Sequence, residues 1–169
     1  MLIRRATSDD LAALAAVVRR VVPQMRAQGN LQWDDSYPNH EVFQADISHG
    51  QLWVAEITGR IAGVIAITNT PEPDYVQADW VNALPALVIH RLAVDPEFQG
   101  NGVARELMHQ AETVAAKQGI SVIRVDTNIE NLATQQLFPS LGYRFAGEIS
   151  LSMRPGQRFL CYEKHLPPP

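Results

Sequence analysis

The stretch that decides the fold runs from Val88 to Ala104 and reads VIHRLAVDPEFQGNGVA. It begins as an apolar strand rich in β-branched residues, passes through a turn that contains Pro96, and reaches Gly100 and Gly102 just before a helical segment. Glycines at such a junction let backbone N–H groups face outward around an anion, and the helix N-terminus adds the positive end of its dipole. The stretch therefore predicts a binding site for a phosphate or pyrophosphate.

Two common phosphate-binding motifs do not fit this turn. A Walker loop ends in Gly-Lys-Ser/Thr, whereas Gly102 is followed by Val-Ala-Arg. A dinucleotide-binding fingerprint needs three glycines in the first strand–helix unit and an acidic residue at the end of the next strand. Here only Gly100 and Gly102 are present, and they lie in the second half of the chain. What remains is Gln99-x-x-Gly102-x-Ala104 after a strand.

This motif resembles the acetyl-CoA pyrophosphate loop of the GNAT N-acetyltransferase superfamily. Downstream, the stretch from Asn131 to Tyr143, NLATQQLFPSLGY, resembles the second signature of that family, a helix that starts at Asn and closes on Leu-Gly-aromatic. The order of the motifs, and the helix and strand between them, agree with the family. The resemblance is sharp from His90 to Tyr143 and looser over nearly the whole chain.

The resemblance implies an α/β protein of the GNAT fold, with a central mixed, mostly antiparallel twisted sheet of about seven strands and flanking helices. It implies acetyl-CoA as co-substrate and direct transfer of the acetyl group to a primary amine of a small molecule or peptide, in a ternary complex. The residues expected at acetyl-CoA are Leu92, Ala93, Val94, Gln99, Gly100, Asn101, Gly102, Val103, Ala104, Arg105, Asn131 and Phe138.

Composition places the chain among ordinary globular proteins. Its 169 residues, 46% of them hydrophobic and 19% charged, suit one domain over 1–169, with 166–169 as an extended tail. The net charge of -4 argues against non-specific binding to nucleic acid or to an anionic membrane. The single cysteine excludes an internal disulfide and a cysteine-cluster metal site, and we expect no metal. Without an apolar run of transmembrane length or a signal peptide, the protein is expected in the cytoplasm.

The pattern along the chain predicts alternating strands and helices. Helices are expected after Thr7 or Ser8 with a kink or break at Pro23, after Asn39, from the glycine loop to Gly119, and after Asn131. The segment 69–84 is a long polar loop for which a functional role is expected. Strands are expected at 2–6, 51–57, 61–68, within the opening stretch, and at 120–127, 143–151 and 158–164. Edge strands near the C-terminus are consistent with a homodimer.

Acetyl transfer to an amine needs stabilisation of a developing oxyanion and a neutral nucleophile. The resemblance offers the backbone amides of Leu92 and Val94 for the oxyanion. A lysine-like amine, with a pKa of about 10.4, costs roughly 4–5 kcal/mol to deprotonate at pH 7, so a base is expected. His90, which shares a strand face with Leu92 in a regular strand, and Asp126, at the end of the strand before Asn131, are the candidates. A hydrogen-bonded core histidine and a turn-capping aspartate are the alternatives.

Phe138 departs from the family signature, which usually has tyrosine at this position as the proton donor for the leaving thiolate. Phenylalanine cannot donate, and release of a bare thiolate of pKa about 8.5 at pH 7 is uphill by about 2 kcal/mol. A non-catalytic acyl-CoA-binding module of the same fold is therefore the first alternative function. A nucleotide-phosphate binder of another α/β fold is the second.

The acceptor site is expected at aromatic residues of two loops, which suit a cationic amine. These are Trp33 and Tyr37 in a stretch that also carries Asp34 and Asp35, and Tyr75 and Trp80 in the later loop. Filling of the core is the alternative role for such side chains.

Overall fold

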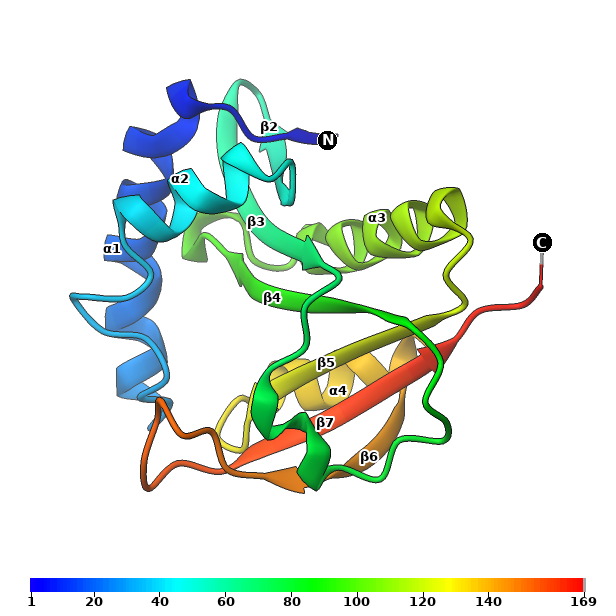
Figure 1. Cartoon of the computed structure of the whole chain (residues 1–169). Coiled ribbons are helices and arrows are strands. Elements are labelled where there is room, and N and C mark those ends of the chain that lie inside the picture. The colour runs from blue at the N-terminus through cyan, green and yellow to red at the C-terminus, as the bar shows by residue number, and fades with distance from the viewer. Residues whose placement is uncertain (169) are drawn as a thin grey trace.

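The computed structural model, which describes residues 1–168, is built on one seven-stranded sheet in the order β1-β2-β3-β4-β5-β7-β6 (Figure 1). Neighbouring strands are antiparallel except β4 and β5, which are parallel. This confirms the mixed, mostly antiparallel sheet that the sequence predicted. The strands are β1 (Leu2–Arg5), β2 (Leu52–Ile57), β3 (Arg60–Thr68), β4 (Ala86–Val94), β5 (Val122–Asn128), β6 (Arg144–Ile149) and β7 (Phe159–His165).

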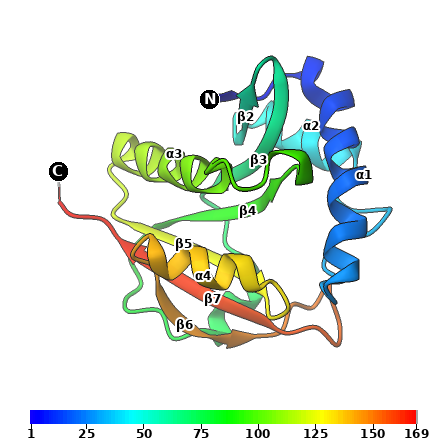
Figure 2. The ribbon, with the colours of Figure 1, turned by 180° about the vertical axis from the view of Figure 1, so that it is seen from behind.

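Helices cover both faces of the sheet, as the two opposite views show (Figures 1 and 2). Helices α3 (Val103–Gln118) and α4 (Leu132–Ser140) pack on one face over the largest apolar cluster. Helices α1 (Leu11–Ala27) and α2 (His40–Ser48) cover the β2–β3 half of the opposite face. In residues 1–168 no helix combines the length and the apolarity needed to cross a membrane.

The predicted helix boundaries are confirmed where a capping side chain sets them. The Asn39 Oδ1 accepts from the Val42 amide at 3.0 Å, the Asn131 Oδ1 accepts from the Thr134 amide at 3.2 Å, and Gly119 ends α3 with a φ of 68°.

A kink or break of the first helix at Pro23 was predicted, and the helix does not break there, because α1 continues to Ala27. Proline costs the helix one backbone hydrogen bond, while Val21 and Val22 beside it are buried against the sheet and hold the helix in place. At the other end of the chain, the Leu166 amide donates to the Ser121 carbonyl at 2.7 Å, and residue 169 of the predicted tail lies outside the described residues.

The predicted loop after β3 lies against the sheet and includes the short 3₁₀ helix Pro73–Gln77. Its Tyr75 is buried, and the Trp80 indole donates to the Tyr75 carbonyl at 2.8 Å. The Val81 amide donates to the fully buried Glu163 of β7, which also pairs with Arg124 and Arg144. The segment 69–85 is therefore fixed to the face opposite α3 and α4.

Strands β4 and β5 separate halfway along their length. Their pairing runs from Ala86 and Val122 to Ile89 and Val125 and then stops. Just beyond, β4 contains a bulge at which Arg91 has a positive φ of 53°. The extra residue shifts the alternation of side chains, so Leu92 packs with the α3–α4 cluster while His90 contacts the 69–85 segment. The expectation that His90 shares a face with Leu92 is therefore wrong.

Candidate active site

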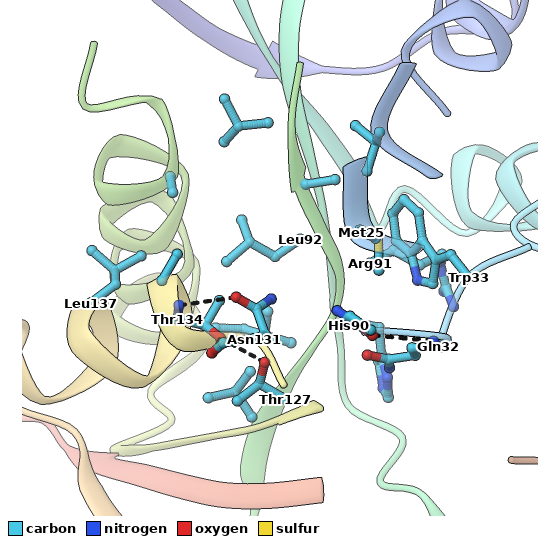
Figure 3. A pocket seen from close by; sticks show the side chains of 18 of the residues that line it. Met25, Gln32, Trp33, His90, Arg91, Leu92, Thr127, Asn131, Thr134 and Leu137 are labelled. Carbon is cyan, nitrogen blue, oxygen red and sulfur yellow. Dashed lines mark hydrogen bonds between the residues drawn. The ribbon is translucent and has the colours of Figure 1, made fainter. Parts of the chain in front are cut away.

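A cavity of about 630 Å³ passes through the split between β4 and β5 and is lined from both faces of the sheet. Figure 3 shows Leu92, Asn131, Thr134 and Leu137 on one side of β4, and Met25, Gln32, Trp33 and His90 on the other. We call the part beside α3 and α4 the loop half, and the part beside the 69–85 segment the acceptor half.

The loop half ends at the glycine turn predicted from sequence. Gly100 and Gly102 line the cavity with φ of 81° and 75°, a conformation that strongly favours glycine, and a Cβ at either position would meet no atom within 4 Å. The first hydrogen bond into α3 is from the Glu106 amide to the Gly102 carbonyl, which leaves the amides of residues 103–105 for a ligand. Arg105 also lines the cavity. The open space at the two glycines would admit a pyrophosphate, which the free amides and the Arg105 guanidinium could bind.

Two anchors hold the turn in place. Asp95 is fully buried, accepts from the Glu97 amide at 3.0 Å and pairs with Arg20 of α1 at 2.5 Å. Burial alone would raise the pKa of Asp95, but the hydrogen bonds from Arg20 and from the Glu97 amide outweigh it and hold the pKa below its usual value. The Asn101 side chain donates to the Phe98 carbonyl at 2.9 Å and so stabilises the turn. Asn101 itself does not line the cavity.

Close packing brings α3 to the end of β4. A Cβ on Gly63 of β3 would lie 2.6 Å from the Val103 Cγ1 and 3.0 Å from the Ala93 carbonyl oxygen. Only glycine therefore lets the first turn of α3 approach this closely. Gln99 forms a reciprocal amide pair with Gln24 of α1, at 2.8 and 3.3 Å, and both residues line the cavity.

Helix α4 supplies the rest of the loop half. The Thr127 and Thr134 hydroxyls are 2.6 Å apart beside Asn131, and all three residues line the cavity. Phe138 also lines it, although only 1% of its surface is exposed, and its ring packs against Tyr162 at 5.5 Å and Tyr143 at 6.0 Å. The Phe138 ring can therefore pack against a ligand in the cavity, but it has no group that could donate a proton.

In the acceptor half, Asp126 lines the cavity from β5. The Tyr75 hydroxyl donates to its Oδ2 at 2.5 Å. Burial, together with the nearby Asp126 carboxylate, raises the pKa of Tyr75, so the phenol stays protonated and remains the donor. Burial also raises the pKa of Asp126, to about 6, although the Tyr75 hydrogen bond acts in the opposite direction. Asp126 is therefore a carboxylate that titrates just below neutral pH.

His90 lines the same half of the cavity and faces the 69–85 segment. Its Nε2 lies 3.3 Å from the Thr70 carbonyl and its Nδ1 lies 3.6 Å from the Glu72 carboxylate. Burial and the adjacent Arg91 guanidinium lower the pKa of His90, which favours the neutral imidazole at pH 7. Both ring nitrogens are thus directed at groups of the protein.

Arg91 is held from the α1–α2 side. Its guanidinium makes two hydrogen bonds of 2.7 Å to Asp46 of α2 and one of 3.0 Å to the Tyr37 hydroxyl. The fork of Arg91 and the carboxylate of Asp46 neutralise each other in this bidentate pair. Because Arg91 sits at the bulge, the pair also fixes the point where β4 leaves β5.

The structure brings most of the predicted site residues to one cavity. Trp33 and Tyr37 line it, whereas Tyr75 and Trp80 lie behind its wall, with Tyr75 in contact with Asp126. Several further residues of the wall were not predicted, because they come from other loops and strands or because the two motifs assign them no role: Gln32, Glu72, Arg91, Thr127, Thr134 and Arg154. Within residues 1–168 no group of three or more His, Cys, Asp or Glu side chains is placed to hold a metal ion.

Comparison with known proteins agrees with this geometry. The model of the acetyltransferase (GNAT) family matches residues 19–143, which is most of the chain. The chain therefore belongs to the GNAT acetyltransferase family, whose members use acetyl-CoA. That membership removes the alternative of a nucleotide-phosphate binder of another fold.

Solved structures share the fold over almost the whole chain. A GNAT family acetyltransferase from Streptococcus agalactiae has a TM-score of 0.84 and 24% identity, with 98% of this chain and 95% of that chain covered. A Salmonella typhimurium protein solved with its cofactor acetyl-CoA has a TM-score of 0.72 and 19% identity, with 99% and 94% covered.

The curated relatives differ more from this chain in length than these solved structures do. The N-acetylaspartate synthetase of Xenopus tropicalis is 25% identical over 67% of this chain, but the match spans only 38% of that protein. The uncharacterized N-acetyltransferase YesJ of Bacillus subtilis is 22% identical over 84% of this chain and 81% of its own length. The chain thus spans little more than a third of the Xenopus relative.

Proposed function

We propose that the chain is an N-acetyltransferase that moves an acetyl group from acetyl-CoA to a primary amine of a small molecule or peptide by direct attack in a ternary complex. The observation that carries the proposal is one continuous cavity through the β4–β5 split. The glycine turn, which would bind the pyrophosphate, lies at one end, and Asp126 and His90 lie at the other. Two ligands that enter from opposite faces of the sheet meet in this split.

In the loop half, the amides that follow Gly102 and the Arg105 guanidinium would hold the pyrophosphate of acetyl-CoA, and Phe138 would pack near its sulfur. The bound cofactor supplies an acetyl thioester, whose carbonyl carbon is the electrophile. The family membership and the open geometry of the glycine turn support this assignment.

The end of β4 would stabilise the charge that develops on the acetyl oxygen. The Asp95 amide donates to the Ala62 carbonyl of β3, and Ala93 is paired with Val64. Because alternate residues of an antiparallel strand direct their amides to the same neighbour, the Val94 amide faces the β5 side, where pairing has stopped. Leu92, two residues earlier, is assigned the same role. An oriented donor of this kind is worth about 3–4 kcal/mol in an oxyanion site.

We assign Asp126 as the general base in preference to His90. A carboxylate with a pKa of about 6 is mostly ionised at pH 7, as a base must be. Tyr75 occupies Oδ2, while the Oδ1 has no hydrogen-bond partner in the described chain and is not among the buried unpaired atoms, so it is open to the cavity. The two nitrogens of His90, in contrast, are directed at Thr70 and Glu72. Tyr75 is a positioning residue for the base.

The test is the release of free CoA from acetyl-CoA in the presence of a panel of amines. The proposal predicts release that depends on the amine and is matched by acetylated product. Asp126→Asn should lose kcat/KM most for acceptors of high pKa, with a deficit that shrinks as pH rises and the amine deprotonates in solution. An unchanged rate for Asp126→Asn with a large loss for His90→Ala would instead assign the base to His90.

Phe138 is the observation that favours a second candidate, a non-catalytic acyl-CoA-binding module, since a phenylalanine, which has no proton to give a thiolate, stands in the cavity wall at the position of the usual tyrosine donor. A chain that binds acetyl-CoA tightly but releases no CoA with any amine of the panel would establish that function in place of the first.

A further inference from the structure

Among the residues that the structure describes, one cation of the acceptor half, Arg154, has no carboxylate partner. Arg154 lies in the loop between β6 and β7 and lines the cavity. Of the other two arginines in the wall, Arg91 is paired bidentately with Asp46, and Arg105 lies at the opposite end beside the glycine turn. Among the described residues no carboxylate lies within ion-pair distance of Arg154.

The Arg154 guanidinium is nevertheless held in a defined place. Its Nε donates to the Gln32 carbonyl at 2.7 Å and its Nη1 donates to the Met153 carbonyl at 3.3 Å. Its centre lies 5.0 Å from the centroid of the Tyr37 ring, which is a stacking distance. Two of the five N–H donors of arginine are thus used, and three remain on Nη1 and Nη2, the pair that binds a carboxylate in fork geometry.

The acidic side chain of Asp34 does not occupy these donors. Asp34 is close enough for Arg154 to lower its pKa as a minor cause. The main causes are its hydrogen bonds from the Ser36 hydroxyl at 2.7 Å and the Ser36 amide at 2.8 Å, which hold the Asp34 carboxylate in its own turn. The free donors of Arg154 are therefore left for something that enters the cavity.

The acceptor half thus has two chemically different ends. Glu72, Asp126 and His90 lie where β4 and β5 separate, at the end that would receive the amine. Arg154 is held by a different set of contacts, where the loop 28–37 meets the β6–β7 loop through its bond to Gln32, and no hydrogen bond or ion pair among the described residues joins it to those three. An acceptor with a cationic amine and an anionic group would match both ends, whereas a simple alkylamine would leave the guanidinium unpaired.

We propose that Arg154 forms a carboxylate-binding subsite and that the acceptor is an amine that also carries a carboxylate. The assignment of this ligand as the acceptor rests on the proposed function, whereas the subsite itself does not. One planar fork with a single uncompensated charge matches a carboxylate monoanion, while a phosphate dianion would call for further donors or cations. Arg154 is a specificity-determining residue in this proposal.

The test is calorimetry on the full chain saturated with CoA, which measures binding independently of turnover. The probes are pairs of equal length with and without the carboxylate: 4-aminobutyrate against butylamine, and 6-aminohexanoate against hexylamine. In at least one pair the carboxylated amine should bind at least tenfold more tightly than the alkylamine. The chain length at which this preference is larger indicates the distance between the amine-binding residues and Arg154. O-phosphoethanolamine against β-alanine distinguishes phosphate from carboxylate.

Variants assign the preference to the residue. Arg154→Gln should abolish the preference and leave butylamine and CoA binding unchanged, and Arg154→Lys should keep part of it because the charge remains without the planar fork. Arg158→Gln is the matched control, because Arg158 lies at the end of the same loop, outside the cavity wall, and pairs with Glu148. Equal binding within both pairs, a preference that survives Arg154→Gln, or tighter binding of O-phosphoethanolamine than of β-alanine would overturn the carboxylate subsite.

The outcomes separate this inference from the proposed function. Carboxylated amines that bind through Arg154 without any release of CoA from acetyl-CoA would support the subsite and refute the acetyltransferase. Acetylation of amines with no preference for a carboxylate would refute the subsite and leave the acetyltransferase standing.

Discussion

Removal of the Tyr75 hydroxyl should shift the pH dependence of acetyl transfer. The 2.5 Å hydrogen bond from Tyr75 stabilises the ionised form of Asp126, so Tyr75→Phe should raise the pKa of Asp126 above its value of about 6. A hydrogen bond to a charged group is worth about 1.5–3 kcal/mol, which corresponds to about 1–2 pKa units. The acid limb of kcat/KM should therefore move from near pH 6 to about pH 7–8.

The assay is kcat/KM from pH 5 to 9.5, measured with an acceptor amine of low pKa so that titration of the amine does not mask that of the base. With a shift of about 1.5 units, activity of Tyr75→Phe at pH 6.5 falls roughly eightfold below wild type and recovers by pH 9. Tyr143→Phe is the matched control, because the Tyr143 hydroxyl is buried without a hydrogen-bond partner in the described chain and Tyr143 does not line the cavity. An acid limb that stays in place in Tyr75→Phe, or a uniform loss at every pH, would refute the reasoning.

Three further changes test other parts of the site. Gly102→Val should weaken CoA binding at least tenfold, about 1.4 kcal/mol, because the residue needs a φ of 75°; unchanged affinity of the folded variant by calorimetry would contradict the loop assignment. Phe138→Tyr should raise the single-turnover rate up to roughly thirtyfold if departure of the thiolate is limiting, since protonation is worth at most about 2 kcal/mol; an unchanged rate at preserved CoA affinity would show that another group or water protonates the thiolate. Asp126→Asn should increase the free energy of unfolding at pH 7 by about 1–3 kcal/mol, because the raised pKa of Asp126 costs the wild type stability as pH rises from about 4 to 6; in denaturant titrations this advantage should vanish below pH 4, and an advantage that persists there would have another cause.

The loop half of the cavity was predictable because its structure is local in sequence. Gly100 and Gly102 stand at a strand–helix junction, and Asn131 caps the helix that it begins. Each of these residues determines backbone conformation within a few positions of itself, so a short motif carries the information.

The acceptor half was not predictable because distant segments form it. Asp126 meets Tyr75 from a loop 51 positions away, and Arg154 meets Gln32 across 122 positions. No glycine in the sequence indicates the bulge at Arg91. The extra residue of the bulge moves His90 to the face opposite Leu92. Without the bulge and these long-range contacts, the sequence could name candidate bases but could not rank them.

The most direct test of the account is a rapid-quench single turnover with acetyl-CoA labelled in the acetyl group and excess enzyme. Direct transfer in a ternary complex predicts that label leaves acetyl-CoA only when amine is present and appears in acetylated amine as fast as free CoA forms, with none on the protein at any time. Label that appears on the protein before the product, or CoA that is released at the same rate without amine, would contradict direct attack through the β4–β5 split.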